Sequence, residues 1–259
     1  MRILFIADAV GVPGRRALEE RLPSLRDELR VDLCILNGEN LADGVGITPK
    51  LADKMLASGV DAITLGNHTW RRSEIVPYLE QSERVIRPAN YSKRAPGKGL
   101  TFVAAADGTD VAVLNFLGSL FLGPPYNAFE IVDELVDEAA SRTPVIVVDM
   151  HAEATSEKVA LAKWLDGKVT AVFGTHTHIQ TNDARVQPGG TAAITDAGMT
   201  GPHDSVIGVQ ADLAIRQMRT GLHVRFETAS GDVRIEGVLV ECGADGRATS
   251  CESVRVHLQ

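Results

Sequence analysis

The stretch Ala62-Ile-Thr-Leu-Gly-Asn-His68 decides the fold, because a short apolar run leads directly into polar side chains. Ala62–Leu65 is typical of a buried β-strand, and Gly66, Asn67 and His68 follow it without a linker. In layered α/β proteins, ligands bind beyond the carboxyl ends of the strands. This stretch therefore predicts one strand of such a sheet and one corner of its binding site.

Outward from this stretch, apolar β-branched runs alternate with segments whose apolar residues recur at spacings of three and four. This alternation predicts an α/β layered fold with helices covering a sheet. The expected strands are Ile3–Ala7, Leu33–Leu36, Ala62–Leu65, Val111–Asn115, Val145–Val148, Thr170–Phe173 and Ala192–Thr195. The expected helices are Arg15–Leu29, Pro49–Ser58, Arg72–Gln81, Ala128–Ser141 and Ser156–Leu165.

The C-terminal segment changes character, because apolar and polar residues alternate along Leu222–Thr228, Asp232–Cys242 and Thr249–Leu258. Turn residues separate these runs, which predicts an antiparallel meander that completes a second sheet. The sequence shows no Pro/Ser-rich linker, low-complexity stretch or internal repeat that would mark a boundary. We therefore expect residues 1–259 to form a single domain.

Composition narrows the class of protein. The 259 residues include 26 Lys and Arg against 34 Asp and Glu, a net charge of −8 that disfavours binding to duplex nucleic acid or an anionic membrane. No apolar stretch approaches the roughly 18 residues of a membrane span, and the start of the chain lacks a signal-peptide cleavage site. Three cysteines are too few and odd in number for a disulfide framework, so we expect a cytoplasmic protein.

Five of the expected strands end in Asp, Glu, Asn or His, and four of the seven histidines lie in these strand-end clusters. A single such residue is usually a helix cap or turn former, but the joint pattern indicates a metal site suited to Mn²⁺, Fe or Zn²⁺. His176 and His178, two apart in an expected extended segment, would project to the same side. The candidate ligands are too many for one tetrahedral ion and about right for two: Asp8, Glu39, Asn40, Asn67, His151, His176 and His178.

At Gly66-Asn67-His68 and Thr175-His176-Thr177-His178 the sequence resembles the calcineurin-like metallophosphoesterases. It departs from their pattern at three places. Val10 stands where the first histidine is usual, Gly38-Glu39-Asn40 replaces Gly-Asp, and Thr69 replaces an acidic residue. With these three departures, the sequence resembles one branch of the family, the YmdB-like bacterial phosphodiesterases.

The resemblance to that branch also rests on Gly66–Trp70, Asp149–Glu153 and Thr195–Pro202, and it covers essentially the whole chain. It implies a four-layer α/β/β/α sandwich of the metallophosphoesterase type. It also implies a two-metal centre, commonly of iron or manganese, that acts on cyclic nucleotides, especially 2′,3′-cyclic ones. Carried over by position, the resemblance assigns one metal to Asp8, Glu39, Asn40 and His178, and the other to Glu39, Asn67, His151 and His176.

The expected mechanism is attack on phosphorus by a hydroxide that bridges two divalent ions. His68 follows the candidate ligand Asn67 without being one itself, and we expect it to protonate the leaving oxygen as the general acid. The alternative is that His68 only hydrogen-bonds phosphate or other parts of the protein.

Substrate contacts are less clearly marked. The loop Gly118–Phe129 contains Tyr126, which could stack on a base, and the loop Gly198–Asp204 contains His203. Packing of these loops over the sheet edge is the alternative interpretation of both.

Three functions compete at this point. The first is hydrolysis of 2′,3′-cyclic nucleotides or related small phosphodiesters. The second is phosphomonoester hydrolysis at the same site, although monoesters carry more charge and would favour additional cationic residues. The third is a regulatory protein that senses a nucleotide or a metal with slow turnover. His68 beside a complete ligand set favours an enzyme, and the sequence is compatible with a homo-oligomer.

Overall fold

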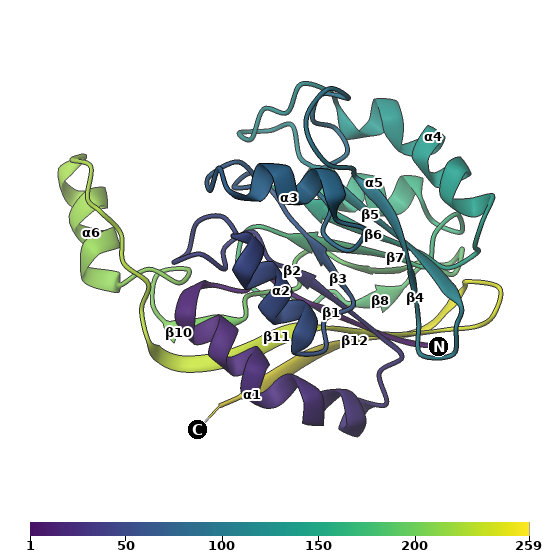
Figure 1. The fold of residues 1–259 in the computed structure, drawn as a ribbon, viewed down its shortest axis with the longest axis horizontal. Coiled ribbons are helices and arrows are strands. Elements are labelled where there is room, and N and C mark those ends of the chain that lie inside the picture. Colours follow the sequence, from purple (N-terminus) through teal and green to yellow (C-terminus); the bar gives the residue numbers. More distant parts are fainter. Residues whose placement is uncertain (259) are drawn as a thin grey trace.

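Two β-sheets pack face to face in this protein, and helices cover both outer surfaces, so the chain forms four layers in the order α/β/β/α (Figure 1). The computed structural model describes residues 1–258. It confirms the α/β fold and the four-layer sandwich expected from the sequence. Within these residues, every helix is too short or too polar to cross a bilayer.

The first sheet has the strand order β10-β11-β1-β2-β3, with β12 paired to the other side of β11. Its strands are β1 (Arg2–Ile6), β2 (Leu33–Asn37), β3 (Ala62–Thr64), β10 (Gly201–Asp204), β11 (Gly231–Cys242) and β12 (Ala248–His257). The second sheet has the order β4-β5-β6-β7-β9-β8. Its strands are β4 (Leu100–Ala104), β5 (Asp110–Leu117), β6 (Ile146–His151), β7 (Ala171–Thr175), β8 (Arg185–Val186) and β9 (Ala192–Ile194).

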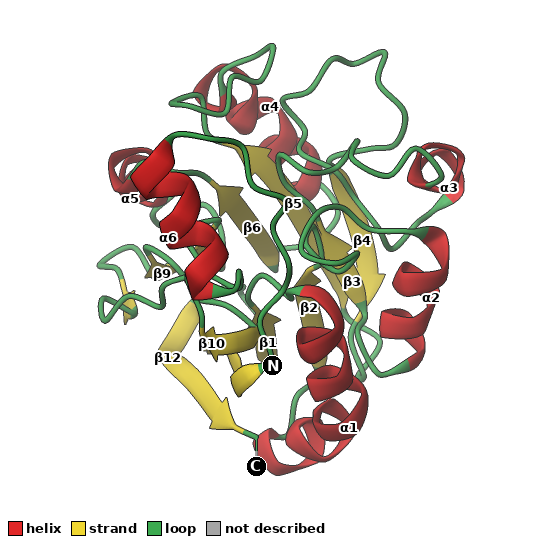
Figure 2. Ribbon diagram, turned by 90° about the vertical axis from the view of Figure 1, so that its left-hand side faces the viewer, coloured by secondary structure: helices red, strands yellow, loops and turns green. Residues whose placement is uncertain are grey.

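Helices α1, α2 and α3 cover the first sheet, and α4 and α5 cover the second (Figure 2). The side chains of Thr48 and Asn127 cap the first turns of α2 and α4, which fixes where these helices begin. A sixth helix, α6, was not expected from the sequence. The helix bounds are α1 (Gly11–Leu29), α2 (Pro49–Ala57), α3 (Ile75–Gln81), α4 (Ala128–Ala140), α5 (Thr155–Trp164) and α6 (Ala211–Thr220).

Alternating side chains of β1 serve two cores. Ile3 and Phe5 lie in the core between the two sheets, whereas Leu4 and Ile6 pack under α1. The ring of Phe5 stacks on that of Phe173 in β7, with centroids 4.6 Å apart, and this contact joins the sheets directly. A strand buried on both faces must be apolar throughout, which explains the continuous apolar run at the start of the chain.

The C-terminal segment differs from the expectation in two ways. β11 pairs antiparallel with β1, so this segment extends the first sheet and does not build a separate one. Leu222–Thr228 forms no strand, and its pairing within the described residues is a single bridge between Thr228 and Val209. Its apolar residues are largely exposed, so their alternation does not reflect a buried sheet face.

A buried ion pair anchors the chain just beyond β7. Lys158 of α5 places its Nζ 2.7 Å from Oδ2 of Asp196, and both side chains are buried. The same Oδ2 accepts hydrogen bonds from the backbone N–H and the hydroxyl of Thr177, at 3.1 and 2.7 Å. The pair therefore holds the loop that carries His176 and His178 against the second sheet.

We expect Lys158→Met to lower the free energy of unfolding by about 3–5 kcal/mol, because the Asp196 carboxylate would remain buried without its cation. Urea denaturation of the full chain measures this change. Lys163→Met, on the exposed side of the same helix, is the matched control and should leave the transition in place. Equal denaturation midpoints for wild type and Lys158→Met would contradict this role.

Candidate metal centre

The structure brings together all seven residues expected to hold metal. Asp8, Glu39, Asn40 and Asn67 follow the parallel strands β1, β2 and β3 of the first sheet. His151 ends β6, and His176 and His178 follow β7 of the second sheet. The carboxyl ends of strands from both sheets thus meet at one point, which is where ligands bind in folds of this kind.

Four ligand atoms surround one half of the centre. The His151 Nε2 lies 3.0 Å from Asn67 Oδ1, 3.1 Å from His176 Nδ1 and 3.4 Å from Glu39 Oε1. Glu39, His151 and His176 also present ligand atoms that all lie within 4.8 Å of one another. One imidazole proton could serve only one of these neighbours, so a shared cation fits the group better than hydrogen bonds do.

Hydrogen bonds behind His151 fix which ring nitrogen is free. The Thr175 hydroxyl donates to Asp149 Oδ1 at 2.7 Å, so its oxygen accepts from His151 Nδ1 at 2.8 Å. When the ring is neutral, its proton is therefore on Nδ1, and the Nε2 lone pair faces Glu39. A carboxylate that orients a histidine through its outer nitrogen is typical of metal ligands.

His176 is oriented in the same way by a residue that follows β6. Its Nε2 lies 3.0 Å from Oε2 of Glu153, which leaves Nδ1 with a lone pair directed at His151. Burial and the neighbouring His151 lower the pKa of His176 to about 3, so the ring is neutral near pH 7. The His176 Nδ1 and the His151 Nε2 converge on one point, an arrangement suited to a divalent transition metal that would take the place of the His151 Nε2 proton.

The other half of the centre contains Asp8, Asn40 and His178. Asp8 is fully buried, and its Oδ1 has no hydrogen-bond partner within residues 1–258, although His178 Nε2 lies 3.8 Å away. His178 Nδ1 donates to the carbonyl of Ile207 at 2.9 Å, so its Nε2 lone pair faces the centre. An unpaired buried carboxylate oxygen beside a free imidazole nitrogen fits a cation.

Asn40 lies between this half and His68. Its Nδ2 is 3.1 Å from His178 Nε2, and its Oδ1 is 2.8 Å from His68 Nδ1. Ligation through Oδ1 therefore requires the carboxamide to rotate so that its oxygen faces His178. The same rotation would turn the amide N–H groups toward His68.

The buried carboxylates and imidazoles shift one another's pKa values. Burial favours a higher pKa for the Glu39 carboxyl, but His151 and His68 outweigh it and hold the pKa well below its usual range. Burial favours a lower pKa for His151, but Glu39 and Asp8 outweigh burial and raise this pKa to about 9. Burial also raises the pKa of Asp8 despite the nearby His178. The buried carboxylates of Glu39 and Asp8 are therefore stabilised by nearby positive charge, which a divalent ion would supply.

Backbone geometry adapts to this crowding. A Cβ at Gly66 would overlap Glu39 Oε2 and His151 Cδ2, so only glycine fits there. His176 and His178 have φ angles of 97° and 63°, and their segment is not extended as expected. Such left-handed backbone costs about 1–3 kcal/mol at each residue and is typically found at functional sites.

His68 lies beside the centre and not within it. Its backbone N–H donates to Glu39 Oε2 at 2.9 Å, and its Nδ1 lies 3.0 Å from Glu39 Oε1. About a quarter of its side chain is exposed (25%), so the ring can reach both the centre and solvent.

The two expected substrate contacts lie outside these interactions. The backbone N–H of Tyr126 donates to the carbonyl of Asn90, and the side chain is largely exposed. His203 places Nε2 3.1 Å from the carbonyl of Met199 and 3.9 Å from Glu236 Oε2. Their role in binding substrate stays a prediction.

The supporting residues were missed by sequence reasoning. Asp149 receives hydrogen bonds from Thr175, from Thr64 in β3 at 2.5 Å and from Asn37 in β2 at 2.9 Å, so it joins three strands. Burial raises the pKa of Asp149 to about 6, although His151 and these hydrogen bonds act to lower it. The only available signal was its place, with Glu153, in the Asp149–Glu153 motif.

Comparison with known proteins adds to this geometry. The model of a family described as "YmdB-like protein" matches residues 4–254. The chain belongs to the YmdB-like family. This YmdB-like protein is 48% identical over 241 residues to the 2′,3′-cyclic-nucleotide 2′-phosphodiesterase of Bacillus subtilis, a match that covers 93% of the chain and 91% of that relative. It is 33% identical to a Mycoplasma genitalium protein that bears the name putative phosphatase/phosphodiesterase, over 100% of the chain and 94% of the relative.

Two solved structures share the fold of this YmdB-like protein. A hypothetical protein from Thermus thermophilus matches with a TM-score of 0.93 and 39% identity over 99% of both chains. A phosphatase from Mycoplasma pneumoniae matches with a TM-score of 0.91 and 32% identity, over 99% of this chain and 93% of that one.

Gly66→Ala should weaken metal binding by about 10–100-fold, the range typical when groups that orient metal ligands are lost. The added methyl group would displace the Glu39 carboxylate and the His151 ring. Titration with Mn²⁺, followed by metal analysis, measures the affinity, and circular dichroism checks the fold. Gly243→Ala is the control, because its new methyl group would meet mainly the side chain of Asp245. Unchanged metal affinity in Gly66→Ala would show that the positions of Glu39 and His151 do not depend on a glycine at residue 66.

Proposed function

We propose that this protein is a phosphodiesterase that hydrolyses 2′,3′-cyclic nucleotides with two divalent ions, iron or manganese, at the candidate metal centre. The observation that carries the proposal is the cluster of carboxylate, imidazole and amide ligand atoms around Glu39 and Asp8. The named activity of the Bacillus subtilis relative supports the choice of substrate. We also propose a cytoplasmic location, with which the three free cysteines are consistent.

The ligand set divides between two ions with Glu39 shared. Asn67, His151 and His176 surround Glu39 Oε1 on one side, and Asp8, Asn40 and His178 lie on the other. When bound, two divalent ions supply activation of water and neutralisation of phosphate charge. Asp8 and Glu39 are the two carboxylates of the set, so the loaded centre keeps net positive charge and favours a phosphodiester monoanion.

His68 is placed to protonate the leaving oxygen. Its Nδ1 lies 3.0 Å from Glu39 Oε1, a contact that holds the ring in position and leaves Nε2 to face the substrate. Cleavage of the P–O bond moves an electron pair to the ribose oxygen, and the proton of Nε2 neutralises that oxygen as it leaves. General acid catalysis of this type typically contributes 10²–10⁴-fold to the rate.

Phosphomonoester hydrolysis is the second candidate, because relatives from two Mycoplasma species carry phosphatase in their names. The two activities would share the metal centre and would differ in the charge and shape of the substrate. A regulatory sensor with slow turnover is the third candidate, and it would bind metal and nucleotide without rapid hydrolysis.

Asn40→Ala should reduce the bound metal from two equivalents to one, because it removes a ligand from the half of the centre that contains Asp8 and His178. Metal analysis after loading with Mn²⁺ measures this stoichiometry. Asn182→Ala, at an exposed position, is the matched control. Two equivalents retained in Asn40→Ala would show that Asn40 is not a required ligand.

His68→Ala should retain both metals and lose about 10²–10⁴-fold in kcat on 2′,3′-cAMP. Turnover of 2′,3′-cAMP, 3′,5′-cAMP and p-nitrophenyl phosphate by the Mn²⁺-loaded protein separates the three candidate functions. His257→Ala is the control, because it changes a largely exposed histidine of β12.

Preferred hydrolysis of p-nitrophenyl phosphate would favour the monoesterase, and absence of turnover with metal bound would favour the sensor. Full activity of His68→Ala would exclude His68 as the general acid.

A further inference from the structure

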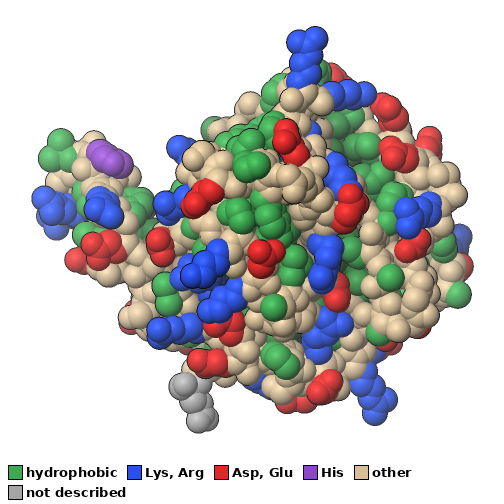
Figure 3. Space-filling model, in the orientation of Figure 1, with side chains coloured by type: hydrophobic (Ala, Val, Ile, Leu, Met, Phe, Trp, Pro, Cys, Tyr) green, Lys and Arg blue, Asp and Glu red, His purple; other side chains and the backbone are tan. Residues whose placement is uncertain are grey.

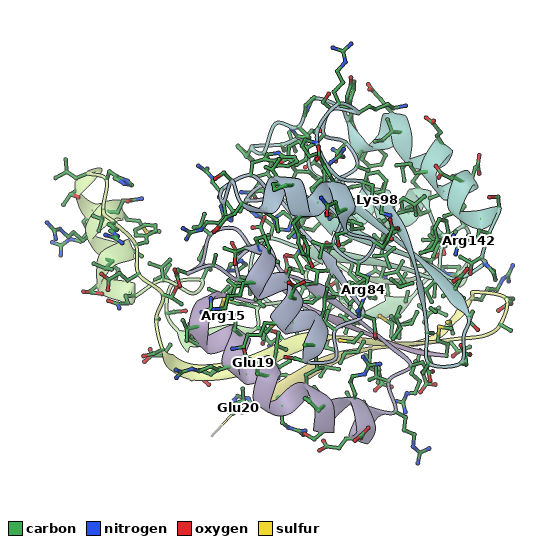
Figure 4. All side chains as sticks on the ribbon, viewed as in Figure 1. Arg15, Glu19, Glu20, Arg84, Lys98 and Arg142 are labelled. Carbon is green, nitrogen blue, oxygen red and sulfur yellow. The ribbon has the colours of Figure 1, made fainter. Side chains whose placement is uncertain are left out.

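The loop between α3 and β4 brings a tyrosine against the turn that carries His68. Tyr91 lies in this loop, and Figure 4 labels Arg84 and Lys98, which stand near its two ends. The ring of Tyr91 packs edge-on against that of Trp70, with ring centroids 5.6 Å apart. Trp70 follows His68 by two residues in the turn after β3. Tyr91 therefore packs on the segment that supplies the expected general acid.

A buried arginine fixes the backbone around Tyr91. Arg87 is 4% exposed, and its guanidinium donates hydrogen bonds to carbonyls on both sides of Tyr91, at 2.8 Å to Pro88 and 3.4 Å to Ser92. It also donates, at 3.1 Å in each case, to the carbonyls of Ala95, Pro96 and Gly97. The donors of one buried cation are thus committed to holding this loop in a single conformation.

Asn90, the residue before Tyr91, provides a second anchor. It is fully buried, and its Nδ2 donates to the carbonyls of Leu117 at 2.7 Å and Tyr126 at 3.0 Å. Its Oδ1 accepts a hydrogen bond from the Leu117 N–H at 2.9 Å. Leu117 is the partner of His151 in the parallel pairing of β5 with β6. Asn90 therefore ties the backbone of Tyr91 to the strand end beside a candidate metal ligand.

The hydroxyl of Tyr91 is left without a hydrogen bond to any residue in the described part of the chain. The side chain is only partly buried, so a ligand can reach it. Burial and the Glu39 carboxylate raise the pKa of this hydroxyl to about 12, although Arg87 and Arg71 act to lower it, so it remains a proton donor near pH 7. A side chain held by two buried anchors and left unbonded is preorganised for a ligand.

The wider surface offers little to attract a phosphate group. The net charge is −8, and on the face shown in Figure 3 the Lys and Arg side chains are interspersed with Asp and Glu. Recognition of phosphate must therefore be local to the candidate metal centre. A neutral donor adds a hydrogen bond to a phosphate oxygen there without changing the net charge of the centre. The phenol of Tyr91 is a donor of this kind.

We propose that the Tyr91 hydroxyl donates a hydrogen bond to a non-bridging phosphate oxygen of the substrate bound at the candidate metal centre. This inference rests on the proposed function and adds a substrate-binding residue to it. The phosphate gains negative charge when hydroxide attacks a phosphodiester, so the hydrogen bond from Tyr91 is stronger in the transition state than in the bound substrate. Trp70 holds the ring in position for this contact.

Tyr91→Phe tests the proposal, because it removes the hydroxyl and keeps the ring that packs on Trp70. Calorimetric titration of the Mn²⁺-loaded full chain with inorganic phosphate should show an affinity about 10- to 150-fold lower than that of wild type, the range for a hydrogen bond to a charged group. The kcat/KM on 2′,3′-cAMP should fall by at least the same factor, while metal analysis should find the wild-type content of Mn²⁺.

Tyr78→Phe is the matched control, because it removes a hydroxyl of α3 that donates to Asp53 at 2.7 Å. It should leave phosphate affinity and kcat/KM unchanged. Circular dichroism checks that each variant is folded.

Wild-type phosphate affinity in Tyr91→Phe would overturn the proposal, as would a loss confined to Tyr91→Ala, which would assign the contact to the ring. Absence of 2′,3′-cAMP turnover by wild type would contradict the proposed function instead. The phosphate titration would still decide the role of the Tyr91 hydroxyl in that case.

Discussion

Two buried carboxylates, Asp8 and Glu39, set the constraint on which the rest of the structure depends. Burying such charges is costly unless polar or positive groups face them, and here the imidazole nitrogens of His151 and His178 from the opposite sheet do so. The two sheets must therefore meet in one register, with β1 and β2 opposite β6 and β7. The Phe5–Phe173 stack maintains that register in the apolar core below the centre.

The supporting residues make the centre rigid before any ligand arrives. Asp149 bonds to strands of both sheets, and through Thr175 it orients His151. Lys158 and Asp196 hold the segment after β7 in the same place. The segment that leads into α6 is joined to this framework too, because the Ile207 carbonyl accepts a hydrogen bond from His178.

Much of the fold and the grouping of the candidate ligands could be predicted from the sequence. Polar residues at strand ends, such as Asn67 after β3, have few possible positions in a layered fold, so their convergence follows from topology. Asp149 could not be recognised, because its role depends on Thr64 in a distant strand. Leu222–Thr228 was assigned wrongly to a strand, since apolar alternation does not distinguish a buried sheet face from an exposed surface.

Because residues distant in the sequence meet at the candidate metal centre, the order of translation limits when this centre can assemble. β1 is translated long before its antiparallel neighbour β11, which begins at Gly231. His176 and His178 also appear late, because they follow β7. The candidate metal centre therefore cannot acquire its full ligand set until synthesis has passed His178. A metal that needs all seven residues could consequently bind only after β7 has been translated.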